Sequence, residues 1–192
     1  KDALWNDPVL CIKWPFPNDF TPIISEKDKS IKPLSARGIP LAAPVSGPRV
    51  LVVGASGQVG AALVEQFGKR NCVGTYNTVQ TDPSFIHMNL EEIAANEATA
   101  GSGLARVHPD VLCICSAFTW VDGAETQLAK AFCVNSTAPA LLAAAANKAN
   151  TKVVFISTDY VFDGVDGPYD ETATPNPVNV YGKSKLEGEQ KV

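Results

Sequence analysis

The stretch RVLVVGASGQVGAALV, from Arg49 to Val64, joins an apolar run, a turn with three glycines and a segment of helical spacing. Gly54 allows a tight turn off a strand, Gly57 lets a ligand approach the backbone, and Gly60 lets the helix pack closely on the strand. The first turn of such a helix carries unpaired N–H groups and the positive end of the helix dipole, which stabilise a pyrophosphate. The stretch therefore predicts a dinucleotide-binding turn, against the alternative of a merely tight strand–helix turn.

Strand-like runs alternate with helical stretches from Val50 onward. Near-continuous apolar strands alternating with helices are typical of a parallel sheet covered on both faces. We expect an α/β fold: a Rossmann-like doubly wound parallel sheet, C-terminally incomplete and preceded by a non-helical N-terminal arm. The expected elements are strands at Val50–Val53, Cys72–Tyr76, Phe85–Met88, Val111–Cys115 and the buried run Lys152–Ser157, and helices at Gly57–Phe67, Ala124–Lys148 and from near Asn179.

Composition divides the chain into three parts. Residues 1–36 are rich in Pro, Asp, Lys and Trp and show no helical period, whereas SARGIPLAAPVSGPR is rich in small residues, Pro and Gly. The second composition is a linker signature. We expect an arm over residues 1–36, a linker over residues 37–48 and a nucleotide-binding domain over residues 49–192.

Charge and composition argue against several classes of partner. The formal net charge of −4 gives no electrostatic reason to expect nucleic acid or an anionic membrane. No apolar run approaches the ~20 residues of a membrane helix, and the N-terminus does not read as a signal peptide, so we expect a cytoplasmic protein. Five cysteines fit no disulfide framework or zinc site, and His87 and His108 lie far apart, so we expect no metal. Whether the protein forms a homodimer stays open.

The stretch after the second expected strand bears on the choice of dinucleotide. An acid at the end of that strand is the usual partner of the NAD ribose. In VGTYNTVQTD no acid follows immediately, Asp82 comes late, and no arginine is placed to bind a 2′-phosphate. Thr75, Tyr76 and Asn77 suit either cofactor. The sequence leaves NADP and NAD open, with a slight preference for NADP.

A tyrosine and a lysine share a helix face near the end of the chain. Tyr181 and Lys185 are four residues apart in VNVYGKSKLEGE. A nearby ammonium favours the phenolate form, so the tyrosine can donate a proton to a carbonyl oxygen as a hydride arrives. Thr158 follows a strand, at the sheet edge where ligands of such folds bind. The alternative, a chance surface pair, is weakened by the glycine turn and this threonine.

Five segments carry a family resemblance. GASGQVG, CSAFTWVDGAE, VNSTAPALLA, STDYVFDG and YGKSKLEGE occur in this order. They resemble the extended short-chain dehydrogenase/reductases, and among these the dTDP-4-dehydrorhamnose reductase family, over Arg49 to Val192. The resemblance implies reduction of the 4-keto group of a nucleotide-linked 6-deoxyhexulose by NAD(P)H, a reaction of deoxysugar biosynthesis. A nucleotide-linked 4-keto-6-deoxysugar would be the substrate.

The resemblance also implies roles for particular residues. Thr158, Tyr181 and Lys185 match the family's catalytic residues, and in the family the lysine also holds the nicotinamide ribose. Asn135 would support the site from the long helix. The residues that would bind the cofactor are Gly54, Ser56, Gly57, Gln58, Val59, Gly60, Asn89, Leu90, Ser116, Ala117, Thr119, Tyr181 and Lys185. Of these, Asn89 and Leu90 would lie near the adenine.

The first segment resembles a second family. LWNDPVLCIKWPFPNDFTPIISEKDKSIKPL, from Leu4 to Leu34, resembles the C-terminal tail of dTDP-4-dehydrorhamnose 3,5-epimerase, a cupin-type jelly roll. This resemblance implies a fragment of a bifunctional epimerase–reductase fusion. An alternative for the whole protein is a non-catalytic dinucleotide-binding regulator, because the regulatory beta subunit of methionine adenosyltransferase resembles the same reductase family. A preceding sugar-pathway domain favours the catalytic interpretation.

Overall fold

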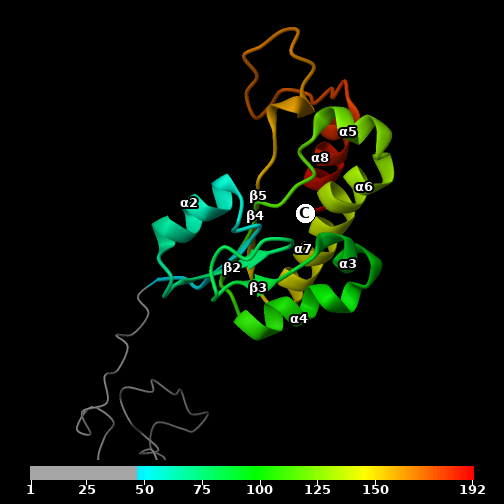
Figure 1. The fold of residues 1–192 in the computed structure, drawn as a ribbon. Coiled ribbons are helices and arrows are strands. Elements are labelled where there is room, and N and C mark those ends of the chain that lie inside the picture. The colour runs from blue at the N-terminus through cyan, green and yellow to red at the C-terminus, as the bar shows by residue number, and fades with distance from the viewer. Residues whose placement is uncertain (1–46) are drawn as a thin grey trace, which may run out of the picture. The chain divides into compact units, whose positions relative to one another are not determined.

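The computed structural model describes residues 47–192, drawn in colour in Figure 1. The predictions for the arm, the epimerase-like tail and most of the linker lie outside the described residues. Five parallel strands form one sheet in the order β3-β2-β1-β4-β5. The strands are β1 (Val50–Val53), β2 (Cys72–Tyr76), β3 (Ile86–His87), β4 (Val111–Ile114) and β5 (Lys152–Phe155).

Helices connect the strands and cover both faces of the sheet (Figure 1). The helical elements are α2 (Gln58–Phe67), α3 (Leu90–Ala95), α4 (Glu97–Val107), α5 (Val121–Thr126), α6 (Leu128–Phe132), the π-helical turn η2 (Cys133–Thr137), α7 (Ala138–Lys148), the 3₁₀ turn η3 (Asp159–Val161) and α8 (Val180–Lys191). The strand order reverses between β1 and β4, which is the switch point at which ligands of such sheets bind. This arrangement confirms the expected Rossmann-like α/β fold.

Alternate residues of β1 build the two halves of the core. Leu51 and Val53 pack with residues of α3, α4 and α7, whereas Val50 and Val52 pack with Val64 of α2. All four strand residues are buried. Because side chains alternate across a strand, one apolar run supplies both faces of the sheet.

The fifth strand differs from its prediction. The run was expected to be buried through Ser157, but β5 ends at Phe155 and lies at the edge of the sheet among the described residues. Val154 pairs in register with Cys113, whose side chain packs on the α2 side of the sheet, yet Val154 is 44% exposed. The described chain places no strand beyond β5 and does not cover Val154 on that side.

The expected helix from Ala124 to Lys148 is interrupted. The helix starts earlier, as α5, breaks at Gln127 (φ −118°, ψ 44°), and then runs through a π-helical turn into α7. Within residues 47–192, the stretch Leu128–Lys148 is long and apolar enough to cross a membrane by length and composition, contrary to our expectation. Leu142 and Ala146 of this stretch are buried in the core cluster that contains Leu51 and Val53 of β1. The core helix of a globular domain packs in this way.

Candidate functional site

The fold itself requires two glycines of the turn. Gly54 has a φ of 85°, and a Cβ added there would lie 2.9 Å from the backbone nitrogen of Ser116, at the end of β4. A Cβ at Gly60 would lie 2.2 Å from the backbone oxygen of Gly54. Real Cβ atoms do not approach backbone so closely. These two positions bring the turn, the start of α2 and the end of β4 together.

Gly57 has no such structural reason. A Cβ there would meet only the Gly54 oxygen, at 3.4 Å, and the residue is exposed at the N-terminus of α2. No side chain caps this helix and its first turn holds no acid. Neighbouring Val59 is 49% exposed, and Ser56 and Gln58 are exposed. The turn therefore presents a helix N-terminus that no side chain caps, and at Gly57 no side chain stands in front of it. This arrangement suits the pyrophosphate of a dinucleotide.

Thr75 has a different role from the one expected. Its side chain is buried, and its Oγ1 accepts a hydrogen bond of 3.1 Å from the backbone nitrogen of Gly54. The hydroxyl therefore holds the glycine turn against β2 and is not directed at a ribose. Tyr76 makes an edge contact with the His87 ring, with the centroids 5.5 Å apart. Of the three residues expected beside the ribose, Asn77 lines a cavity.

That cavity, of about 160 Å³, gathers four of the expected cofactor residues. Asn89, Leu90, Ser116 and Ala117 line it with Asn77. Asn89 Oδ1 accepts a hydrogen bond of 2.8 Å from the backbone nitrogen of Glu91 and so caps α3.

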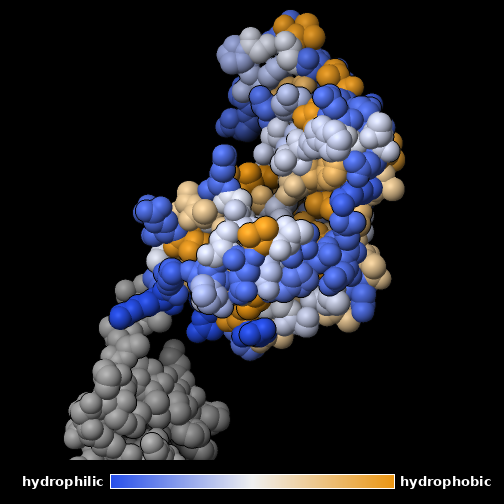
Figure 2. Space-filling model, in the orientation of Figure 1, coloured by the Kyte–Doolittle hydropathy of each residue, from blue (hydrophilic) through white to orange (hydrophobic). Residues whose placement is uncertain are grey.

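Two further residues of this cavity were not expected. Glu91 and Lys130 form an ion pair of 2.9 Å and both line it. They are far apart in the sequence and no motif links them. Thr119 was expected to line the cofactor, but it is exposed and does not line this cavity. Figure 2 shows hydrophobic surface in the recess between α2 and the α5–α6 segment.

The structure brings the expected catalytic residues to one place. Thr158 Oγ1 accepts a hydrogen bond of 3.3 Å from the backbone nitrogen of Tyr160, and the Tyr160 ring packs edge-on against Tyr181, with the centroids 5.6 Å apart. Lys185 Nζ donates a hydrogen bond of 2.6 Å to the backbone oxygen of Ile156, two residues before Thr158. Tyr181 and Lys185 of α8 thus both contact the segment 156–160, which follows β5 and contains Thr158.

The N-terminus of α8 is fixed by its own sequence. Asn179 caps the helix through a hydrogen bond of 2.7 Å from the backbone nitrogen of Gly182 to its Oδ1. Glu125 of α5 accepts a hydrogen bond of 2.8 Å from the backbone nitrogen of Val180. A Cβ at Gly182 would lie 2.1 Å from the backbone oxygen of Tyr160, so α8 lies directly against η3. The helix start predicted near Asn179 is confirmed.

Lys185 is a buried cation. Its side chain is 1% exposed, and Nζ lies 3.8 Å from the centroid of the Phe155 ring. Burial lowers the pKa of Lys185 to about 8, while the nearby Glu189 carboxylate and, secondarily, the titratable Cys115 act in the opposite direction. An ammonium loses hydration on burial, which disfavours its charged form. A buried lysine whose pKa is lowered in this way, beside a strand end, is a candidate functional residue.

Asn135 joins three parts of the site. Its Oδ1 accepts a hydrogen bond of 2.7 Å from the backbone nitrogen of Phe118, and its Nδ2 donates to Phe118 O and to Ser184 Oγ, at 3.1 and 2.9 Å. The residue is fully buried in the π-helical turn. Such turns inside α-helices are frequent at functional sites. Asn135 links the long helix to α8 and to the segment after β4.

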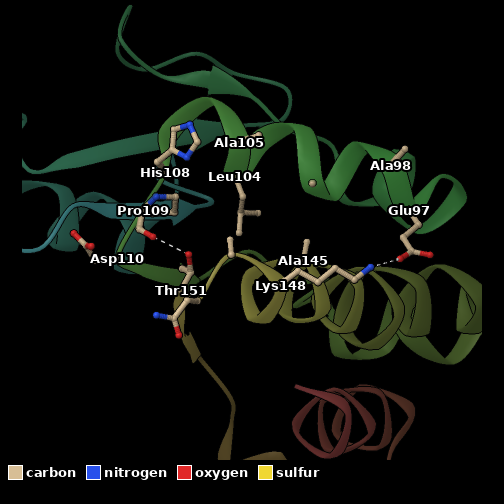
Figure 3. Close-up of a pocket in the computed structure, with 13 residues that line it drawn as sticks. Glu97, Ala98, Leu104, Ala105, His108, Pro109, Asp110, Ala145, Lys148 and Thr151 are labelled. Carbon is tan, nitrogen blue, oxygen red and sulfur yellow. Dashed lines mark hydrogen bonds and ion pairs between the residues drawn. The ribbon is translucent and has the colours of Figure 1, made fainter. Parts of the chain in front are cut away.

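Another cavity lies at the other end of the sheet (Figure 3). It measures about 810 Å³ and lies between α4 and α7, beside Pro109 and Thr151, which precede β4 and β5. Glu97 and Lys148 form an exposed ion pair of 3.4 Å at its rim. None of the expected site residues lines it. Ligands of parallel sheets bind at the carboxyl ends of the strands, so the site above is the better candidate.

Comparison with curated proteins gives one family and two kinds of relative. Residues 48–192 match the family described as the RmlD substrate binding domain. The chain is 36% identical over 149 residues to methionine adenosyltransferase 2 subunit beta of Xenopus tropicalis, covering 77% of this chain and 43% of that protein. It is 35% identical over 149 residues to dTDP-4-dehydrorhamnose reductase of Mycobacterium tuberculosis strain H37Rv, covering 75% of this chain and 45% of that protein.

A solved structure gives the same relationship. The dTDP-4-dehydrorhamnose reductase of Bacillus anthracis in complex with NADP matches with a TM-score of 0.65 and 31% identity, covering 78% of this chain and 50% of that chain. The chain spans less than half the length of the two curated relatives named above.

Proposed function

Because the chain belongs to the RmlD substrate binding domain family, we propose that the protein is an NAD(P)H-dependent nucleotide-sugar ketoreductase. It reduces the 4-keto group of a nucleotide-linked 6-deoxyhexulose, of the dTDP-4-dehydrorhamnose to dTDP-rhamnose type. The observation that carries the proposal is the contact of Tyr181 and the buried Lys185 with the segment after β5 that carries Thr158. A reductase needs a proton donor, a carbonyl-binding hydroxyl and a cation near the substrate carbonyl, and Tyr181, Thr158 and Lys185 would fill these roles.

The proposed cofactor is NADP or NAD. Its pyrophosphate would lie against the N-terminus of α2 at Gly57, and its adenine in the cavity lined by Asn89, Leu90, Ser116 and Ala117. Lys185 would hold the nicotinamide ribose. The similar reductase of Bacillus anthracis was solved with NADP, which agrees with the slight preference for NADP.

The residues of this chain handle the proton. When bound next to Lys185, NADPH or NADH would provide the hydride for the substrate carbonyl carbon. The Tyr181 hydroxyl gives its proton to the carbonyl oxygen, which becomes the product hydroxyl, and the Lys185 ammonium stabilises the phenolate that is left. Solvent then returns the proton to Tyr181. Thr158 Oγ1, which donates to Asp159 Oδ1 at 3.2 Å, turns its proton toward the carbonyl oxygen when substrate binds.

Two further proposals concern the protein beyond the reductase site. Residues 1–36 are the C-terminal tail of a 3,5-epimerase domain, residues 37–48 a linker and residues 49–192 the first part of a reductase. The alternative function is dinucleotide-binding regulation, which the 36% identity to methionine adenosyltransferase 2 subunit beta supports. The proposed epimerase tail favours catalysis.

Oxidation of NADPH or NADH with a nucleotide-linked 4-keto-6-deoxysugar tests the proposal. Turnover by the full-length protein should fall about 10²–10⁴-fold in Tyr181→Phe, as is typical for loss of a general acid. Cofactor affinity should survive, because the change removes one hydroxyl. The 192-residue chain should be nearly inactive. Unchanged turnover in Tyr181→Phe would refute the mechanism, and firm cofactor binding without turnover on any such sugar would favour the regulator.

A further inference from the structure

Three consecutive residues link the end of β5 to the site. The Ile156 oxygen accepts the Lys185 hydrogen bond, Ser157 Oγ donates to Oε1 of Glu189, and Thr158 carries the hydroxyl proposed to bind the carbonyl. Glu189 and Lys185 both belong to α8. The central residue of this segment is therefore tied to α8 by Glu189, and its two neighbours serve the site.

Glu189 and Lys185 lie one helical turn apart and share a face of α8. Among residues 47–192, the groups whose charge acts on Lys185 are Glu189 on its own helix and Cys115 just after β4, and Tyr181 lies one turn before Lys185 on the same face of α8. The remaining contacts of its ammonium are the uncharged Ile156 oxygen and the Phe155 ring. Burial raises the pKa of the Cys115 thiol to about 11, so this thiol is uncharged at neutral pH. The negative charge near Lys185 is that of Glu189.

The other acid in this part of α8 has different partners. Glu187 Oε1 accepts hydrogen bonds of 2.5 Å from Lys191 Nζ and 2.8 Å from Ser136 Oγ. Glu187 lies two residues after Lys185 on α8, so its side chain is directed to a different face of the helix. The two glutamates share a helix, a side-chain type and a hydrogen-bonded serine, and they differ in whether their charge reaches the buried lysine. Glu187 is therefore a matched control.

We propose that Glu189 is a positioning residue of the site: its carboxylate keeps the Lys185 ammonium charged and, through Ser157, fixes the segment that carries Thr158. The significance of this role for reduction rests on the proposed function. Without the Glu189 charge, the groups around the buried lysine among residues 47–192 are the Ile156 carbonyl, the Phe155 ring, the neutral Cys115 thiol and, one helical turn away, Tyr181. The neutral form of the lysine then becomes favoured at lower pH.

A titration of Lys185 itself tests the proposal without substrate or cofactor. The 192-residue chain is labelled with ¹³Cε-lysine, and the Lys185 signal, assigned by its loss in Lys185→Arg, is followed by NMR from pH 6 to 10. The wild-type pKa should be about 8. Glu189→Gln keeps an acceptor for Ser157 but removes the charge, so the midpoint should fall by on the order of one pH unit. Ser157→Ala frees the carboxylate and should give a smaller fall.

Two variants decide what a shift means. Glu187→Gln should leave the Lys185 midpoint unchanged, and Glu189→Asp, which keeps the charge, should restore most of the wild-type value. An unchanged midpoint in Glu189→Gln, or an equal fall in Glu187→Gln, would overturn the proposal. The two proposals can fail separately. If the Lys185 midpoint falls as predicted in Glu189→Gln but the chain binds neither NADPH nor NADH, the action of Glu189 on Lys185 is supported and the proposed function is contradicted.

Discussion

At the scale of single residues, Lys185 combines two opposing effects. Its ammonium is withdrawn from water, which lowers its pKa to about 8, and it is held by the Ile156 oxygen and the Phe155 ring. A lysine with an ordinary pKa would be charged at any physiological pH and could not titrate there. This one changes charge just above neutrality, so the properties of the site should change with it.

Cofactor affinity should therefore depend on pH in one direction. Lys185 is protonated below its pKa of about 8, so the affinity for NADPH should be constant at lower pH and fall as pH rises through 8. Calorimetric titrations between pH 6.5 and 9.5 measure this dependence. Lys185→Arg keeps its charge throughout this range and should lose the inflection. An inflection of the same size in Lys185→Arg would assign it to another group.

Individual site residues were predictable where a motif fixed them. Thr158, Tyr181 and Lys185 lie in two short segments whose spacing indicates their chemistry, and the structure brings those segments together. Partners outside such motifs were missed. The hydrogen bond between Ser157 and Glu189 joins residues 32 apart in the sequence, and neither residue type alone signals a contact.

At the scale of elements, the close packing of α8 depends on the lack of a side chain at Gly188. A Cβ at Gly188 would lie 2.2 Å from the backbone oxygen of Asn135 and 3.0 Å from the Phe155 ring. The glycine thus allows α8 to approach the π-helical turn closely enough for the hydrogen bond between Ser184 and Asn135. This close approach places Lys185 within hydrogen-bond distance of the Ile156 oxygen, just after β5.

Alanine at two glycines should have opposite effects. Gly188→Ala should destabilise the chain by about 1–3 kcal/mol, because the added methyl group has no space. Gly101→Ala in α4 meets nothing within 4 Å and should stabilise it by about 0.5–1 kcal/mol, as expected for glycine replaced inside a helix. Urea unfolding midpoints measure both. Stabilisation by both substitutions would show that α8 does not pack this closely.

Helices and strands whose apolar residues follow a clear period were predicted, and helices without such a period were missed. The helix after the glycine turn ends at Phe67, as expected. Helices α3 and α4 were not expected, although Asn89 and Asn96 cap them and acids follow in each first turn. These caps were the available signal. Glycines inside α4, including Gly103, which makes room for Met88, weaken its helical pattern.

At the scale of the molecule, a parallel sheet covered on both faces followed from the alternation of strands and helices, but the exposure at the sheet's edge did not. An apolar, β-branched run predicts a buried strand, and β5 has that composition. Its exposure depends on what lies beyond it, which no local pattern encodes. Val154 and Ile156 remain partly exposed, at 44% and 36%.

The proposed division of the chain predicts where proteases act. Trypsin should cleave first at Arg37 or nearby, because residues 37–48 have the composition of a linker. A core that begins between residues 38 and 50 and retains the glycine turn should persist. Mass spectrometry of a time course identifies it. Early cleavage within residues 50–192, with the linker intact, would contradict this division.

Binding of NADPH to the 192-residue chain tests the central claim most directly, because the site begins with the glycine turn. The account predicts calorimetric binding by the wild type, loss of binding in Gly57→Leu, whose side chain would occupy the place of the pyrophosphate, and retained binding in Gly101→Leu at the far end of the sheet. Gly57 has space for a side chain in the fold itself, so the variant should remain folded by circular dichroism. Equal affinity of the wild type and Gly57→Leu would contradict the account.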